Sequence, residues 1–179
     1  MSYPNFSYEK RLWKRGFKVI AGLDEVGRGC FAGPVVAAAV VFQPQELNFI
    51  FKIPKEIIID DSKKLGPKQR ETAAKWIKKN AYTYGIGSAS AKLINRLGMA
   101  KATQVAFRRA VTSASLKIGS YNERLLAKNK AKSSRIEFLL IDAFFIPYVK
   151  GLPRGTKNIK GDGRLKSRSA RQLAIVKGD

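Results

Sequence analysis

Histidine is absent from this chain, and cysteine occurs once, as Cys30. Without histidine the protein cannot use a Ser-His triad, a histidine general base or ordinary zinc catalysis. A single cysteine excludes an internal disulfide and fits a reducing compartment. Any catalytic site must therefore be built from carboxylates, lysine, serine, tyrosine or Cys30, and we interpret Cys30 as a small packing residue rather than a nucleophile.

Acidic residues and long apolar runs are also scarce. The chain has 13 acidic against 35 basic residues, a formal net charge of +22 and a pI near 10.4. This excess predicts a polyanionic partner, most simply nucleic acid, because each phosphate contact releases counterions. No apolar run has the length of a membrane span, and no signal-peptide core follows the N-terminal basic residues, so we expect a cytoplasmic protein. A chain of 179 residues with 45% hydrophobic residues suits one domain.

The stretch from residue 17 to residue 42 carries the first chemical signal. An apolar strand over residues 17–23 ends at Asp24 and Glu25, and Gly27-Arg28-Gly29 follows at once. Glycine lets the backbone approach a ligand closely. Apolar residues resume over 33–42 as a second strand, which predicts a hairpin-like pair. Acids at a strand end beside a glycine-rich turn are typical of a metal site.

Further elements follow in order along the chain. Residues 1–16 predict a helical or irregular lead-in that packs through its aromatic residues. A helix is expected over 67–80, a strand over 82–90 weakened by two glycines, a long helix over 92–132 with an apolar stripe, and a strand over 136–142. A weak helical pattern covers 169–177.

Two more groups of polar residues stand out. Ser62 and Lys63 suit a phosphate contact, or else a plain charged turn before the helix at 67–80. Asp142 closes an apolar strand, where a carboxylate is costly unless it meets a cation; the alternative is a loop-start helix cap. Asp162 lies in a glycine turn.

Four carboxylates, Asp24, Glu25, Asp142 and Asp162, thus lie next to strand ends or glycine turns in a basic chain. Oxygen-only ligands select Mg²⁺ or Mn²⁺. Two such ions about 4 Å apart can activate a water and stabilise the leaving oxygen of an in-line phosphodiester cleavage. Composition and chemistry together predict metal-dependent nucleic-acid hydrolysis.

Five blocks in this order resemble the signature of the type 2 ribonucleases H, the ribonuclease HII family. They are residues 22–29, 32–40, 61–65, 140–142 and 159–162, within a match over about 17–163. The resemblance implies an α/β, ribonuclease H-like fold with a mixed five-stranded sheet flanked by helices. It also implies cleavage of the RNA strand of RNA/DNA hybrids and incision 5′ to a ribonucleotide embedded in duplex DNA. We expect a lead-in over 1–16, one catalytic domain over 17–179 and a monomer.

The resemblance also implies residue roles. Asp24, Glu25, Asp142 and Asp162 fall on the family's metal-binding acids, for Mg²⁺ or Mn²⁺. Gly27, Arg28 and Gly29 fall on the turn that senses the ribose 2′-hydroxyl, which distinguishes RNA from DNA. Ser62 and Lys63 fall on a motif near the substrate backbone.

The chain departs from the family pattern mainly at its C-terminus. Residues 167–179 are a faint echo of the family's serine- and alanine-rich helix, the later segment with a stacking tyrosine is missing, and Asn95 stands in place of an aspartate. We therefore expect weaker preference for an isolated ribonucleotide and looser support of Asp162. The alternative function is a catalytically impaired nucleic-acid binder with a basic, phosphate-clamping tail. A basic ribosome-associated protein fits the charge but leaves the carboxylates unexplained.

Overall fold

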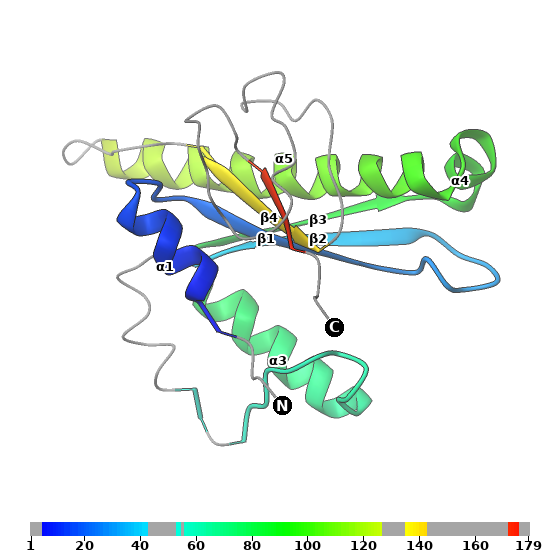
Figure 1. Cartoon of the computed structure of the whole chain (residues 1–179), viewed down its shortest axis with the longest axis horizontal. Helices are drawn as coiled ribbons and strands as arrows, with labels where there is room; N and C mark the ends of the chain where they lie inside the picture. Colours follow the sequence, from blue (N-terminus) through cyan, green and yellow to red (C-terminus); the bar gives the residue numbers. More distant parts are fainter. Residues whose placement is uncertain (1–4, 43–52, 55, 127–134, 143–171, 176–179) are drawn as a thin grey trace.

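The computed structural model describes residues 5–42, 53–54, 56–126, 135–142 and 172–175, and these residues form one sheet with helices on both faces (Figure 1). The sheet has five strands in the order β3-β2-β1-β4-β5. β1 and β2 pair antiparallel, as do β2 and β3, whereas β1–β4 and β4–β5 are parallel. The predicted mixed sheet flanked by helices is therefore confirmed. The strands are β1 Ile20–Val26, β2 Val35–Val41, β3 Thr83–Ala89, β4 Phe138–Asp142 and β5 Gln172–Ile175.

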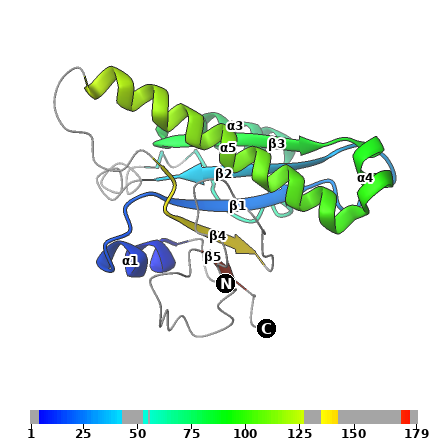
Figure 2. The same cartoon turned by 90° about the horizontal axis from the view of Figure 1, so that it is seen from above.

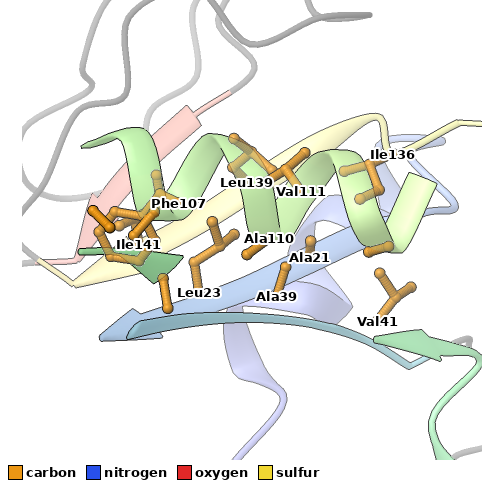
Figure 3. Packing of buried hydrophobic residues seen from close by; sticks show 14 of the residues in the cluster. Ala21, Leu23, Ala39, Val41, Phe107, Ala110, Val111, Ile136, Leu139 and Ile141 are labelled. Carbon is orange, nitrogen blue, oxygen red and sulfur yellow. The ribbon is translucent and has the colours of Figure 1, made fainter. Parts of the chain in front are cut away.

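One face of the sheet is covered by α5 (Met99–Leu126), which lies along β3 and β2 (Figure 2). Its apolar stripe, predicted from the helical spacing, is confirmed as core. Figure 3 shows Phe107 and Val111 of α5 in one apolar cluster with Leu23, Leu139 and Ile141 of the sheet. Four alanines of the stripe are fully buried and let the helix lie close to the strands: Ala102, Ala106, Ala110 and Ala114.

Two glycines of β3 explain how closely α5 approaches. A Cβ at Gly85 would overlap the carbonyl oxygen of Ala110, and one at Gly87 would overlap that of Ala106. The sequence suggested that these glycines weaken a strand. The structure shows instead that β3 forms through both positions and that its bare backbone is the surface against which α5 packs.

The long helix predicted over 92–132 is wrong at one point, because it is divided into α4 (Ala91–Leu97) and α5. Gly98 lies between them with φ of 78°, a left-handed value that favours glycine, and its N–H closes α4 on the carbonyl of Ile94. The described part of α5 ends at Leu126.

The opposite face of the sheet carries α1 (Ser7–Lys14) and α3 (Pro67–Asn80). Leu12 of α1 is buried with Ile20, Phe138 and Leu140 in a second apolar cluster. The lead-in therefore packs as expected, and the bounds predicted for the helix at 67–80 are confirmed. No helix in the described portion is long and apolar enough to cross a membrane.

The weak helix predicted over 169–177 is wrong. Residues Gln172–Ile175 form β5, which pairs parallel with β4 up to Asp142↔Ile175. The free edge of β4 offers backbone hydrogen-bond partners that a short sequence window does not reveal, so tertiary context overrides local propensity.

Candidate active site

β1 delivers the acid pair to the edge of the sheet. Asp24 and Glu25 are adjacent in the strand, so their side chains point to opposite faces. Asp24 is exposed on the face of α1 and α3, and its Oδ1 accepts the N–H of Glu25 at 2.9 Å. Glu25 lies on the face of α5, in line with the buried Leu23. The two carboxylates thus bracket the end of one strand.

Arg28 is bound to Glu25. Its Nη1 donates to Oε1 of Glu25 at 3.1 Å, and the side chains are 44% and 12% exposed respectively. An ion pair with one partly exposed member contributes about 1 kcal/mol or less to stability. Its main effect is to hold the Glu25 carboxylate in one direction. Sequence reasoning assigned these two residues to separate tasks and missed their contact.

The turn between β1 and β2 needs glycine for two different reasons. Gly27 has φ of 100°, and a Cβ there would lie 2.5 Å from the carbonyl oxygen of Pro34. Gly27 is therefore required by the turn itself. At Gly29 a Cβ would meet no atom within 4 Å, so the space beside this backbone is open to a ligand.

Asp142 reaches the same edge from the neighbouring strand. The parallel register ends at Leu23↔Ile141, and the next residues of the two strands are Asp24 and Asp142. Neighbouring strands lie about 4.8 Å apart, so these two backbones adjoin. Asp162 lies outside the described residues. Among the side chains that the structure describes, no three carboxylates or thiols form a metal-binding group.

Ser62 and Lys63 lie in the turn that precedes α3, and both are exposed. The Lys63 N–H donates to Oδ1 of Asp61 at 3.0 Å, and the Ser62 carbonyl accepts from Nη1 of Arg70 at 3.2 Å. These hydrogen bonds engage the backbone groups of Ser62 and Lys63, and their two side chains face solvent.

The same turn holds a perturbed carboxyl. The pKa of the Asp60 carboxyl is lowered below its usual value by two neighbours. The N–H of Asp61 donates to its Oδ1 at 2.7 Å, and the Lys64 ammonium lies 3.3 Å from the same oxygen.

A cavity of about 530 Å³ opens beside Asp24, on the face opposite α5. Apolar residues make up most of its lining, including Ile59 and Trp76, and Glu9 of α1 also faces it. Burial raises the pKa of the Glu9 carboxyl, partly offset by a backbone hydrogen bond. The lining comes from segments far apart in the chain, so sequence patterns carried no signal for it.

Comparisons with known proteins show which family this chain resembles. A family model described as ribonuclease HII matches residues 21–137. Ribonuclease HII of Caldanaerobacter subterraneus subsp. tengcongensis is 37% identical over 178 residues, which are 96% of this chain and 60% of that protein. Ribonuclease HII of Alkaliphilus metalliredigens is 36% identical, over 87% of this chain and 65% of that protein. Ribonuclease HII of Chloroflexus aggregans is 34% identical, over 95% of this chain and 69% of that protein. The chain thus spans about two thirds or less of the first two relatives.

Solved structures support the fold alone. A crystal structure of a mutant protein of Bst-RNase HIII superposes with a TM-score of 0.51 at 20% identity, covering 73% of this chain and 39% of that one. The resemblance drawn from the ordered motifs is confirmed by the family model, which covers well over half of the sequence. The chain belongs to the ribonuclease HII family.

Proposed function

We propose that this chain is a divalent-metal-dependent endoribonuclease that cleaves the RNA strand of RNA/DNA hybrids and incises 5′ to ribonucleotides embedded in duplex DNA. One observation carries the proposal: Asp24, Glu25 and Asp142 come to the ends of two parallel neighbouring strands, beside the Gly27–Gly29 turn. Family membership supports it.

The donor chemistry fits a hard divalent cation. The acids supply oxygen ligands only, and the chain has no histidine, which suits Mg²⁺ or Mn²⁺ rather than zinc. Asp24, Glu25, Asp142 and Asp162 would hold it. When bound, such ions activate a water and stabilise the oxygen that leaves phosphorus, giving 3′-hydroxyl and 5′-phosphate ends.

The chain's own residues then orient the substrate. In this proposal the backbone of the turn at Gly29 approaches the ribose, where there is open space, and senses the 2′-hydroxyl. Arg28 joins this turn to Glu25, so recognition and the carboxylates share one rigid unit. Ser62 and Lys63, exposed in the turn before α3, would contact the substrate backbone.

We further propose a monomeric enzyme that acts in the cytoplasm. Cys30 is exposed, so the packing role predicted for it is wrong. As the single cysteine it suits a reducing compartment, where it would not form an intermolecular disulfide. Gel filtration with and without reductant tests the monomer, because a dimer that persists in reductant would contradict it.

The deciding experiment uses a labelled DNA duplex with one ribonucleotide beside an all-hybrid duplex, with Mg²⁺, Mn²⁺ or a chelator. Metal-dependent cutting of the hybrid, and cutting on the 5′ side of the lone ribonucleotide, are expected. Asp142→Asn should lower turnover by about a hundredfold or more while binding changes little, because a carboxylate ligand is lost and the substrate surface is kept. Glu71→Gln on the exposed face of α3 removes the same charge and is the control.

The alternative is a nucleic-acid binder without useful catalysis. It is favoured by the net charge of +22. Salt-dependent binding of both duplexes by folded protein, with no cutting in either metal, would establish this alternative and refute the ribonuclease.

A further inference from the structure

We propose that the α4–α5 corner, residues 91–101, is a second phosphate-binding surface, on which Lys92, Arg96 and Lys101 hold the nucleic-acid backbone to one side of the acid pair. The inference rests on the proposed function only in that the ligand is a nucleic acid. The inference specifies the surface that the duplex would follow beyond the acid pair at the end of β1.

The corner lies at the same edge of the sheet as the acids. β1 and β3 both pair antiparallel with β2, and the register joins Val26, Val36 and Ser88 at one level. α4 begins at Ala91, just after β3 ends. Figures 1 and 2 both show α4 at the end of the molecule where the β1–β2 turn lies. Two strand spacings, about 10 Å, separate β1 from β3.

The corner is anchored to the core. Ser90 caps α4, its Oγ accepting the Leu93 N–H at 3.3 Å, and Leu93 and Met99 pack against the core cluster. Nη1 of Arg109 donates to the Ser88 carbonyl at 2.6 Å and ties α5 to the end of β3. Lys92, Arg96 and Lys101 are exposed on this support. Three cations are therefore presented to solvent from a fixed base.

The surrounding sequence does not neutralise these cations. Between Glu71 and Glu123 the chain has nine lysines and arginines and no acidic residue. A duplex carries one phosphate charge per about 1.7 Å of axis, so a surface beyond the end of β3 meets the same duplex several phosphates away from the acids. Positive charge there offsets the repulsion between phosphates and the acid pair. In the sequence, this surface is indicated by the stretch without acidic residues.

General basicity is the competing explanation, and α3 provides a matched control. Lys75, Lys78 and Lys79 are also exposed, and the helix leads into the start of β3. There Thr83 pairs with Val41, which pairs with Ala21, so this is the opposite edge of the sheet. β3 has seven residues and therefore spans about 23 Å between the two ends of the sheet. The α3 lysines are therefore too far away to contact a duplex that follows the corner.

The test compares the full chain with K92Q/R96Q/K101Q and with K75Q/K78Q/K79Q, in binding to an RNA/DNA hybrid over a range of salt with metal chelated. We expect the corner variant to bind roughly 10- to 100-fold more weakly at moderate salt, and the slope of log affinity against log salt to fall by about 2 to 3. The α3 variant should change affinity by less than about threefold. Glutamine is a good helix former, and circular dichroism melts verify that both variants fold.

The outcomes separate this inference from the proposed function. Equal losses in the two variants, or no loss at the corner, overturn the corner as a specific surface whether or not the wild-type chain cuts RNA. Hybrid binding that depends on the corner, in a wild-type chain that cuts neither duplex with metal, supports the corner and refutes the nuclease.

Discussion

Arg28 and Glu25 form a hydrogen-bonded ion pair, with Nη1 3.1 Å from Oε1, although one belongs to a glycine turn and the other to a strand. The contact crosses only three positions, so it depends on the way the chain leaves β1. It makes the orientation of a proposed metal ligand depend on the turn proposed to read the ribose.

Replacing Arg28 by alanine should therefore lower incision by about tenfold or more, because small displacements of a reacting group are costly, while the free energy of unfolding falls by about 1 kcal/mol or less. Arg28→Lys keeps the charge but not the planar fork and should give an intermediate rate. Single-turnover rates and denaturant unfolding measure the two effects. A loss of several kcal/mol with a normal rate in the surviving folded protein would contradict the positioning role.

Gly27 and Gly29 should respond differently to alanine. Gly27→Ala forces a left-handed φ on a residue with a Cβ and overlaps the Pro34 carbonyl, so it should destabilise the fold by about 2 kcal/mol or more. Gly29→Ala meets open space and should leave stability nearly unchanged, yet it should slow incision if the substrate approaches this backbone. Unfolding and incision measured on the pair check both expectations. Equal stability of the two variants would disprove the turn geometry.

Gly85→Ala should push α5 away from β3. The added methyl overlaps the Ala110 carbonyl, and overpacking of this kind costs about 1–3 kcal/mol, sometimes more. Gly22→Ala is the matched control, since it is a strand glycine whose Cβ would only touch the Val40 carbonyl at 4.0 Å. Thermal unfolding distinguishes the two, and similar melting temperatures would mean that α5 does not lie so close.

The raised pKa of Glu9 should make its contribution to the free energy of unfolding decrease as the pH rises, which is the opposite of the usual behaviour of a carboxyl. Burial raises its pKa above the ordinary value of 4.5, so the folded protein keeps the proton after the unfolded chain has released it. Its stability contribution is therefore fully present below pH 4.5 and is lost as the pH rises through the folded pKa. Glu9→Gln, a neutral isostere, should gain stability relative to wild type over that rise. Denaturant unfolding across pH tests this, and a difference independent of pH would contradict it.

Local patterns were sufficient to predict the parts of the fold that depend on neighbours in sequence. The β1–β2 hairpin, α3 and the buried stripe of α5 all follow from runs of apolar residues and from Pro67 at a helix start. The sequence also placed Asp24 and Asp142 each at the end of an apolar strand, and the structure adds that these two strands are parallel neighbours.

What the sequence did not reveal depends on distant partners or on single backbone angles. Residues 172–175 pair with β4 instead of coiling, since the strand edge exists only in the fold. Gly98 divides the long helix through one left-handed φ, and glycine inside a helical pattern is otherwise tolerated. The cavity beside Asp24 and the Arg28–Glu25 contact depend on side-chain directions that spacing does not specify. The functional roles of all the predicted site residues stay predictions: Asp24, Glu25, Gly27, Arg28, Gly29, Ser62, Lys63, Asp142 and Asp162.

The parallel pairing of β1 with β4 also bears on the order in which the sheet forms during folding. β1, β2 and β3 follow one another as neighbours, with α5 packed on them, whereas β4 joins β1 only after the chain has returned from the end of α5. The Glu137 carboxylate that accepts the Lys18 N–H bridges 119 positions at this junction. Non-local contacts of this length form later than hairpins. During synthesis on the ribosome Asp24 and Glu25 emerge early, so the proposed metal site would be complete only after this long loop has closed and Asp162 has followed Asp142.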